Sequence, residues 1–558
     1  MIMFKMNNLF KTIAAVIILA GLTACDKFLD KMPDNRAELN SQEKIRALLT
    51  SAYSTGTYLF FSEYMSDNVD NLGDDNPGTN RFVDQCYTWA DVTETDNDSP
   101  KYFWEGGYEA INTANQALEA IEKMAGCEEG DLNVKAIEQA GLTAEMAEAL
   151  LCRAYHHFML VNFFSLNYNV NTSDKDLGIP YIDRVPQELN PQYERGTVAE
   201  VYDKIDKDLE IALRYVDDSY YKVPKYHFNV KAAYAFACRF YLFYEKWDLA
   251  AEYATKCLGS QPAQVLRNWK YRNSLEKDRE VKSNDYIKST YSANLMLMTA
   301  YTAFGYYMGY PGITKYSHNA FLNFSEIHFA KNIWGNEQTG WRNVYSWYWE
   351  APEWYSGSTF DQMAFWKIPY LFEYTDPVAR IGYAHAVYPA FTTDETLLNR
   401  AEAYVMLGRY DEAAADLDTW THNLIKPANF SGTLTPEFIH EFYQGVEYWT
   451  PEVPTIKKHL HPAFAIGGEG ELRESMLQCV LQFKRIENSA QGLRWLDVKR
   501  YGIEITRRTL QPDPDAGDDD AGFKLLNGAV DVLTVDDPRR AMQIPPDTQA
   551  AGIAPNPR

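Results

Sequence analysis

Hydrophobic residues recur at steps of three and four along much of the chain, which is the spacing of amphipathic helices. One such stripe covers residues 108–123. A second starts at Thr143, a residue type suited to the N-cap position, and reaches Val161. A third follows the sequence Thr197-x-x-Glu200, which has the form of a capping box. The pattern therefore predicts three long helices in the first half of the chain.

Two later segments, 233–258 and 398–417, are similar to each other. Each reads as a helix, a tight turn at an aromatic residue (Trp247 or Tyr410), an acid, two alanines and a second helix. This is similar to the tetratricopeptide pattern, in which small residues let two helices approach closely. We therefore expect a mainly α fold, a tetratricopeptide-like scaffold of helix pairs that is discontinuous rather than a regular solenoid.

Between these two segments the chain is rich in Tyr, Trp, Gly, Asn and Ser and has few amphipathic stripes. It predicts a large irregular insert of loops, short strands and short helices, which is the usual place for a binding site. A second irregular region follows Thr506. The expected regions are a signal peptide (1–24), a lipidated cysteine and tether (25–45), an N-terminal helical scaffold (46–260), an aromatic-rich binding insert (261–393) and a C-terminal region with a helix pair and an irregular tail (394–558).

The N-terminus has the form of a secretory signal peptide, with Lys5 and Lys11 before a short apolar run. That run is too short for a comfortable transmembrane helix, and no later stretch is long and apolar enough to span a bilayer. Leu22-Thr23-Ala24-Cys25 looks like a bacterial lipobox, so we expect Cys25 to carry the lipid anchor and to be the chain's one attachment to a membrane. The alternative is simple secretion with Cys25 as an ordinary cysteine.

Charge and motifs narrow the function. A formal charge of −24 argues against binding of nucleic acid by the body of the protein, because phosphate backbones need a basic surface. The chain has no H-E-x-x-H, G-x-S-x-G or phosphate-binding glycine loop, so we predict no enzyme activity. The cysteines show no C-x-x-C spacing and predict buried free thiols, with a Cys238–Cys257 disulfide left open.

No metal or other cofactor is predicted. His459-x-His461 has no third ligand nearby, and His156-His157 falls in a helical stripe, which predicts one packed ring and one exposed ring. The acidic run from Asp513 to Asp520 could hold Ca²⁺ through its oxygens, but its spacing is not that of an EF-hand loop. A solvated acidic turn is the expected structure there.

Eight short motifs, in order over nearly the whole chain, resemble the SusD/RagB family of nutrient-binding outer-membrane lipoproteins. They are the lipobox with Asp26-Lys27-Phe28-Leu29-Asp30-Lys31-Met32-Pro33, Trp104-x3-Tyr108-x2-Ile111-x3-Asn115, Ala147-Glu148-Ala149-Leu150-Leu151-Cys152-Arg153-Ala154-Tyr155, Gly178-Ile179-Pro180-Tyr181, Leu398-x-Arg400-Ala401-Glu402-Ala403-Tyr404, Gln491-Gly492-Leu493-Arg494-Trp495-Leu496-Asp497-Val498-Lys499-Arg500-Tyr501-Gly502, Ile544-Pro545 and Asn556-Pro557.

The resemblance implies a SusD-like α fold and a lipoprotein on the cell surface, in the outer membrane. It implies a SusC-like TonB-dependent transporter as the partner, and nutrient oligomers as ligands, usually glycans and sometimes peptides. Asp26 directly follows the lipidated cysteine, a position that signals inner-membrane retention in some other bacteria. The outer-membrane expectation therefore depends on the family and not on the lipobox.

Sugar binding needs flat aromatic faces for C–H patches and fixed polar groups for hydroxyls. The stretch 341–355 holds seven aromatics with Arg and Asn interleaved. If residues 345–349 are extended, Tyr345, Trp347 and Trp349 share one face; the alternative is that these rings are the core of the insert. Six residues of the stretch are candidate ligand contacts: Trp341, Asn343, Tyr345, Trp347, Trp349 and Trp354.

A second wall of the site is expected from the loop that carries Asp67-Asn68-x-Asp70-Asn71 and leads through Arg81 to Trp89. Arg81 and Trp89 are its candidate contacts, and a solvated surface loop is the alternative. The sequence thus predicts a non-enzymatic protein that binds an oligosaccharide and delivers it to a transporter. Three other hypotheses remain: a peptide-capturing RagB-like protein, a lipid-anchored glycoside hydrolase with two facing carboxylates in an aromatic cleft, and a structural scaffold whose rings are buried.

Overall fold

The computed structural model describes residues 39–558 except for 75, 77, 79, 129, 189–190, 336–346, 349–352, 357–360 and 516–522. Within this part the fold is mainly α, as predicted, with small sheets between the helices. The expected signal peptide, Cys25 and most of the tether lie outside the described residues. None of the described helices combines the length and the apolar character that crossing a membrane requires.

The N-terminal part of the chain is built from helices. They are α3 (Gln42–Leu49), α4 (Leu59–Met65), α5 (Arg81–Tyr87), α6 (Pro100–Ala125), α7 (Val134–Ala140), α8 (Thr143–Phe164), α9 (Val198–Tyr215), the 3-10 helix η1 (Pro224–Tyr226), α10 (Val230–Phe243) and α11 (Trp247–Leu258). Long helices pack in succession, α6 on α8, α8 on α9 and α10 on α11. A single strand, β1 (Asp70–Asn71), interrupts them.

Three of these helices confirm the predicted stripes. α6 contains the first stripe and ends where Gly126 adopts a left-handed conformation, with φ of +72°. α8 begins at Thr143, but the cap position is Leu142, whose side chain makes no capping hydrogen bond; nearly every residue of α8 is buried, so packing stabilises it. α9 starts with the predicted capping box, in which the Thr197 hydroxyl accepts from the Glu200 amide and the Glu200 carboxylate accepts from the Thr197 amide.

Two expectations about side chains in the scaffold have different outcomes. His156 and His157 are both buried, so the prediction of one exposed ring is wrong. Their rings make hydrogen bonds with backbone carbonyl oxygens of residues 52 and 153, and burial lowers the pKa of His156 to about 4. Cys238 and Cys257 are buried free thiols.

The two tetratricopeptide-like pairs lie side by side although the insert separates them in sequence. The second pair is α16 (Thr393–Met406) and α17 (Tyr410–Leu424), and α11 of the first pair packs on α16. In each pair two alanines are buried near the start of the second helix, which lets the backbones approach closely. Trp247 and Tyr410, the expected turn aromatics, are the first residues of α11 and α17.

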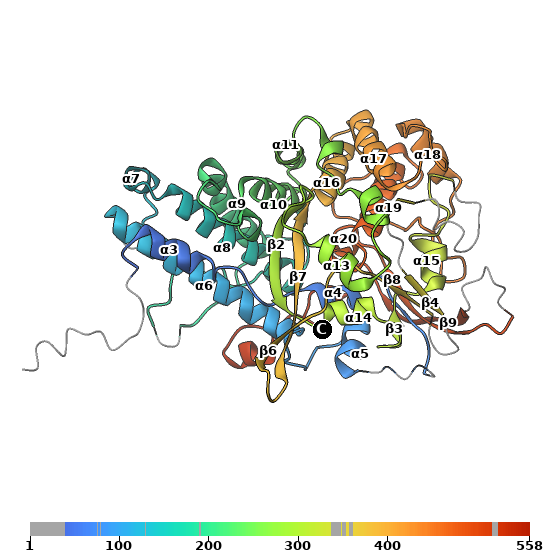
Figure 1. Cartoon of the computed structure of the whole chain (residues 1–558), viewed down its shortest axis with the longest axis horizontal. Helices are drawn as coiled ribbons and strands as arrows, with labels where there is room; N and C mark the ends of the chain where they lie inside the picture. The colour runs from blue at the N-terminus through green and yellow to red at the C-terminus, as the bar shows by residue number, and fades with distance from the viewer. Residues whose placement is uncertain are drawn as a thin grey trace, which may run out of the picture.

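The insert contains short elements and one three-stranded antiparallel sheet, in the order β2-β7-β6. Its elements are η2 (Pro262–Gln264), α12 (Trp269–Asn273), α13 (Arg279–Tyr286), β2 (Asn294–Tyr301), α14 (Phe304–Gly309), β3 (Tyr316–Ser317), α15 (Ala320–Glu326), β4 (Glu353–Ser356), β5 (Asp361–Ala364), β6 (Leu371–Asp376) and β7 (Ile381–Thr392). β7 runs straight into α16, so the sheet is joined to the second helix pair without a linker. The β6–β7 hairpin extends beyond the body of the molecule (Figure 1).

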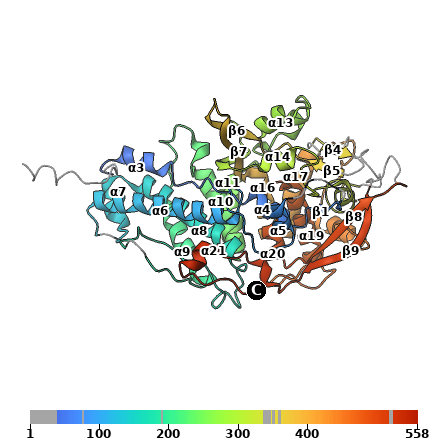
Figure 2. The same ribbon diagram turned by 90° about the horizontal axis from the view of Figure 1, so that it is seen from below.

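The C-terminal part returns to the start of the chain. Its elements are α18 (Pro436–Gln444), α19 (Leu472–Glu487), α20 (Arg494–Arg500), β8 (Ile505–Pro512), β9 (Phe523–Leu533), η4 (Pro538–Arg540) and α21 (Pro546–Ala550). The mixed sheet β3-β1-β8-β9 pairs strands from the N-terminal part, the insert and the C-terminal part. Figure 2 shows the result: α6–α9 fill one end of an elongated molecule, and β8 and β9 lie toward the other.

Candidate ligand-binding surface

The structure describes part of the predicted aromatic stretch. Trp347 is buried, 1% exposed, and its ring lies 5.2 Å from Trp334 and 6.4 Å from His328. Its backbone forms a bridge with Ile425 at the end of α17. In this structure Trp347 is therefore a core residue, and its ring offers no open face to a ligand. Trp354 lies in β4, and its side chain is outside the described part.

Four other candidates of this stretch, Trp341, Asn343, Tyr345 and Trp349, lie outside the described residues. Tyr348 is next to Trp347, half-buried, and its amide donates to the carbonyl oxygen of Leu424 over 2.6 Å. The described part of the stretch is thus attached to the C-terminal end of α17. The ligand role of the undescribed residues stays a prediction.

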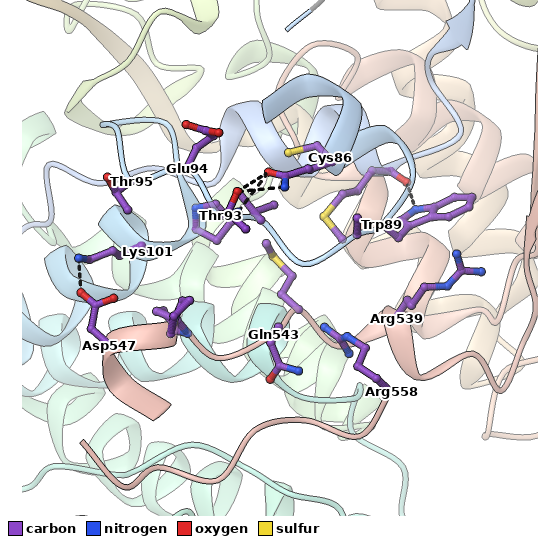
Figure 3. Close-up of a pocket in the computed structure, with 18 residues that line it drawn as sticks. Cys86, Trp89, Thr93, Glu94, Thr95, Lys101, Arg539, Gln543, Asp547 and Arg558 are labelled. Atoms are coloured by element: carbon purple, nitrogen blue, oxygen red, sulfur yellow. Dashed lines mark hydrogen bonds and ion pairs between the residues drawn. The ribbon is translucent and has the colours of Figure 1, made fainter. Parts of the chain in front are cut away.

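Trp89 is buried at the wall of a small pocket of about 180 Å³ between α5, the start of α6 and the C-terminal tail (Figure 3). Its indole N–H donates to the carbonyl oxygen of Met65 over 2.8 Å, and the guanidinium groups of Arg507 and Arg539 lie 4.3 and 5.3 Å from its ring. The hydrogen bond and the two guanidinium contacts hold the ring in place. With 3% exposure, Trp89 has little surface left for a sugar.

The first part of the loop expected as a second wall is neither solvated nor open. Asn68 and Asp70 are buried, and the side chain of Asp67 is 8% exposed within the same network of ions. Asp67 accepts two hydrogen bonds from Arg494, at 2.8 and 3.0 Å, and Asp70 accepts two from Arg508, at 2.9 and 3.0 Å. These carboxylates therefore join the N-terminal loop to the C-terminal part of the chain, and the alternative of a solvated surface loop does not hold for its first half.

Glu326, the last residue of α15, is the centre of this network. Its carboxylate lies 2.7 Å from Lys458, 2.7 Å from Arg508 and 3.3 Å from Arg485. Burial alone would raise the pKa of Glu326, but the three positive charges outweigh it and lower the pKa to about 2. Because the insert, α19 and β8 each supply one of these residues, the network connects the insert to the C-terminal part.

Metal ligands do not gather in the described part of the chain: no group of three or more His, Cys, Asp or Glu side chains there is arranged to hold an ion. His459 is paired with Glu469, with 2.6 Å between Nδ1 and the carboxylate. Asp513 is paired with Lys524 at 2.8 Å, and residues 516–522 of the acidic run are outside the described part.

Exposed rings gather on another part of the insert. Tyr306 on α14 and Tyr310 just after it have ring centroids 4.9 Å apart, and Tyr370, which precedes β6, lies 5.4 Å from Tyr306. On β6, Phe372 and Tyr374 share one face of the strand, with centroids 4.9 Å apart. All five rings are at least partly exposed, and we call them the aromatic surface. α14 lies beside the base of the β6–β7 hairpin in both views (Figures 1 and 2).

The aromatic surface is linked to both parts of the predicted site, to the aromatic stretch through Arg279 and to the loop before Arg81 through Asn80. The Arg279 guanidinium lies 3.5 Å from the centroid of the Tyr310 ring. Tyr355, in the described end of the predicted stretch, has its pKa raised by burial and by Glu353, while nearby Arg279 lowers it. The other link is at α5, where the amide of Asn80, the residue before Arg81, donates to the hydroxyl of Tyr307 over 3.3 Å.

Arg81 is exposed at the start of α5, and its guanidinium donates to the Thr93 hydroxyl over 2.8 Å. Of the two candidates in the second wall, Arg81 is therefore the accessible one. Its neighbour Asn80 contacts α14, so the aromatic surface has a polar group of this loop at its border. Trp89 and Trp347 lie in the core, whereas Arg81 is exposed at the start of α5 and Tyr355 is half-buried in β4.

Fixed supports hold α14. Asp98, in the loop before α6, accepts hydrogen bonds from the Thr302 hydroxyl and from the Ala303 amide, the latter at 2.9 Å. Burial raises the pKa of Asp98 to about 6, partly offset by these two bonds. On the other side, a Cβ at Gly305 would lie 2.6 Å from the carbonyl oxygen of Pro369, so only glycine lets the segment before Tyr370 approach this closely.

Gly382 has a similar role in the hairpin. A Cβ at this position would lie 2.0 Å from the carbonyl oxygen of Glu373 and 2.7 Å from the Phe372 ring. The ring therefore lies across the glycine, as aromatic side chains do when they cover a glycine in a neighbouring strand. Its outer face remains 41% exposed, beside Tyr374 at 54%.

The aromatic surface was not among the sequence candidates. The signal in the sequence is weak: the segment 301–310 holds four tyrosines at irregular spacing, and β6 alternates Phe372 and Tyr374 with polar residues. The stretch 341–355, where aromatic residues are denser, is the one that composition indicates as the ligand site. Chemically, the surface offers flat ring faces with a guanidinium and an amide at its edge, the two kinds of group that sugar rings need.

Comparisons with known proteins agree with this architecture. Residues 27–242 match the model of a SusD-like family described as starch-binding and associating with the outer membrane. The fold also matches solved structures over most of the chain. The N-terminal part of the chain is therefore similar to a SusD-like family. A comparison with curated proteins found no match.

Three solved structures illustrate the likeness in fold. A Bacteroides vulgatus protein proposed to bind sugar is 16% identical, with a TM-score of 0.60 over 94% of this chain and 99% of that chain. A SusD superfamily protein from Bacteroides fragilis is 16% identical, with a TM-score of 0.58 over 92% and 99%. A SusD-like carbohydrate binding protein from Bacteroides vulgatus is 13% identical, with a TM-score of 0.57 over 92% and 96%. At these identities the likeness establishes the fold.

Proposed function

We propose that this SusD-like protein binds nutrient oligosaccharides at the cell surface through its aromatic surface. The observation that carries the proposal is the group of five rings on or beside α14 and β6, three exposed and two partly exposed, held by buried supports and bordered by Arg279 and Asn80. Monomeric proteins do not usually gather large exposed rings on one side without a binding role. The family description as starch-binding supports a sugar as the ligand.

Binding at this surface depends on stacking. Each ring face packs against the C–H patch of one sugar, and Arg279 and Arg81 replace water at hydroxyl groups. The rings are tilted to one another, by 45° between Tyr306 and Tyr310 and by 46° between Tyr306 and Tyr370, so successive sugars of one chain meet different planes. Exposed stacking contacts are individually small, so we expect weak to moderate affinity for a short oligomer.

We also propose that the predicted stretch completes the site. Its described residue Tyr355 interacts electrostatically with Arg279, whose guanidinium lies 3.5 Å from the centroid of the Tyr310 ring. Trp341, Asn343, Tyr345, Trp349 and Trp354 are the proposed further contacts. Single alanine substitutions at Trp349 and Trp354 test this extension separately from the five rings.

The cellular role follows from the same proposal. Cys25 anchors the chain by lipid in the outer membrane, with the body at the cell surface, and the ligand passes to a SusC-like TonB-dependent transporter. The family description, which includes association with the outer membrane, supports this location. The protein itself is a binding protein and carries out no chemistry on the glycan.

The test uses the chain from residue 26 onward with a panel of soluble glycans, in affinity gels and by calorimetry. The variant Tyr306→Ala plus Tyr374→Ala should lose at least tenfold in affinity. Phe438→Ala is the control, because Phe438 is similarly exposed but lies on α18. Equal affinity of the double variant and the wild type would contradict the proposal, and release of sugar products by the purified protein would contradict the binding-only role.

A further inference from the structure

One edge of the insert sheet is open. β2 is an outer strand, paired with β7 on one side only. Tyr301 donates its amide to the Thr55 carbonyl oxygen, away from β7, whereas Thr302 donates to Ala384 on the β7 side. Since alternate residues of an antiparallel strand direct their N–H and C=O groups to opposite sides, Leu297 and Thr299 face away from β7.

Both ends of this edge are occupied by the protein itself. The Asn229 side-chain amide donates to the Leu295 carbonyl oxygen over 2.8 Å, and Thr55 accepts from Tyr301 over 3.0 Å. Between these two bonds, no described residue pairs with the N–H and C=O of Leu297 or Thr299. Leu297 is 1% exposed, and a backbone donor and acceptor that are buried without partners are costly.

These groups border a pocket of about 380 Å³ between β2, α6, η1 and the loop after α3. Its walls are rich in hydroxyl groups. The lining includes the acidic side chain of Glu109 and contains no Lys or Arg. Glu109 is exposed on α6. Behind the pocket, the buried Glu148 carboxylate is 2.8 Å from Nδ1 of His227 and accepts a hydrogen bond from the hydroxyl of Tyr53, also over 2.8 Å.

We propose that this pocket binds a short extended peptide that carries a basic residue, by adding it as a strand to the open edge of β2. The two outward residues are two positions apart, or about 6.8 Å, which is the repeat at which an extended peptide presents paired donors and acceptors. Two or three peptide residues fill the window between Asn229 and Thr55. This site is separate from the aromatic surface and goes beyond the proposed glycan binding.

Charge favours the basic residue. Glu109 at the rim and Glu148 behind the wall are both acidic, and the lining offers no cation to receive an acidic side chain. The net charge of −24 adds a general attraction for cationic ligands. A peptide with Lys at its central position therefore satisfies the open backbone groups and places its ammonium group near Glu109.

The probe is acetyl-Val-Lys-Val amide with a fluorescent label, titrated with the chain from residue 26 onward. We expect saturable binding, at least fivefold weaker binding of the same peptide with Glu in place of Lys, and at least tenfold weaker binding of a peptide N-methylated at both the Lys and the second Val amides, which removes the donor that faces β2 in either direction of the added strand. Equal binding of the N-methylated peptide, or no binding of the Lys peptide at millimolar concentration, would overturn the proposal.

Variants locate the site. Thr299→Pro removes the outward N–H of β2 and fills the edge, so it should weaken the Lys peptide at least tenfold, while Thr299→Val keeps the N–H and should bind as the wild type does. Glu109→Gln should weaken the Lys peptide several-fold and leave a Val-Gln-Val peptide unchanged. If Thr299→Pro does not fold, the Glu109→Gln result and the N-methylated peptide decide the question.

The glycan panel separates this inference from the proposed function. Thr299→Pro and Glu109→Gln should keep glycan affinity, and Tyr306→Ala plus Tyr374→Ala should keep peptide affinity. Loss of peptide binding in the ring variant would place the peptide on the aromatic surface and overturn the assignment to β2.

Discussion

Two groups of side chains in the same insert, the ionic network at Glu326 and the aromatic surface at Tyr306, differ in almost every physical respect. Glu326 is 1% exposed and its three cations come from distant parts of the chain, whereas Tyr306 is half-exposed and its ring neighbours come from the same insert. The network joins the insert to the body, and the surface is left free. The difference shows that, in these two groups, the charged side chain of the insert attaches it to the rest of the molecule, whereas its rings are left accessible to a ligand.

The network should give the largest effect on stability. Glu326→Gln removes the negative charge that three buried cations share, and breaking a buried ion pair on one side typically costs about 3–5 kcal/mol. We expect a loss of this size in the free energy of unfolding, measured with urea at pH 7. Glu276→Gln, at an exposed position of the insert, is the matched control and should change stability by less than about 0.5 kcal/mol.

Acid should reveal the same network. The pKa of Glu326 in the folded protein is lowered to about 2, below its value in the unfolded chain, so its contribution is present above about pH 4.5 and is lost as the pH falls toward 2. Glu326→Gln should therefore flatten the stability profile in this range. An unchanged profile together with a loss under 1 kcal/mol at pH 7 would mean that the network does not join the insert to the body.

Asp98 combines features of the two groups, because it is a buried carboxyl group that supports the aromatic surface. Its effect on the pH dependence of stability should be opposite in sign to that of Glu326. Its pKa in the folded protein is raised to about 6, so its favourable contribution is complete below about pH 3.8 and is lost as the pH rises through 6. The wild type should lose up to about 3 kcal/mol relative to Asp98→Asn between pH 4 and pH 7.

The measurement for Asp98 is urea unfolding of both proteins across this range. Asp96 is close to Asp98 and has its own pKa raised by burial, so Asp96→Asn is run in parallel and should change the profile less. If wild type and Asp98→Asn have parallel profiles, the pKa of Asp98 is the same in the folded and the unfolded protein, and the argument from burial is wrong.

The glycine beneath the aromatic surface should have an intermediate effect. Gly305→Ala places a methyl group 2.6 Å from the carbonyl oxygen of Pro369, and the backbone must shift to relieve this contact. We expect a cost of about 1–3 kcal/mol and a several-fold loss of glycan affinity, because Tyr370 moves away from Tyr306. Gly126→Ala would test a left-handed conformation instead, so Gly432→Ala, whose Cβ meets the Phe430 ring at an ordinary 3.4 Å, is the better control.

The helices were predictable from the sequence because their signals are local. The stripe that became α6, the capping box of α9 and the alanines of the two helix pairs depend on neighbours three or four residues away. The order in which the pairs pack was not predictable, since α11 meets α16 across the whole insert. The resemblance carried by eight motifs added to this pattern the expectation that the helical scaffold is SusD-like.

The candidate site was predicted less well, for a physical reason. Composition shows that Trp347 and Tyr306 are half-polar rings in the same insert, but exposure depends on tertiary contacts: Trp334 packs against the buried Trp347, whereas Tyr306 is only partly buried. The same holds for Asp67, which reads as a loop acid until α20 supplies Arg494. Residue type therefore indicated the chemistry of the site and not its position.

Substitution of Tyr374 should have the smallest effect on stability and a large effect on ligand binding. It therefore tests most directly the contrast between the ionic network and the aromatic surface. Tyr374 is 54% exposed on a hairpin that projects from the body, so Tyr374→Ala should change the free energy of unfolding by less than about 0.5 kcal/mol. Removing one stacking face should nevertheless weaken a bound oligosaccharide by about tenfold, or about 1.4 kcal/mol. Thermal unfolding and calorimetry on the same samples measure both quantities. A variant that loses stability and affinity together would show that Tyr374 belongs to the core of the hairpin. The ring would then stabilise the fold, as the charges of the ionic network do.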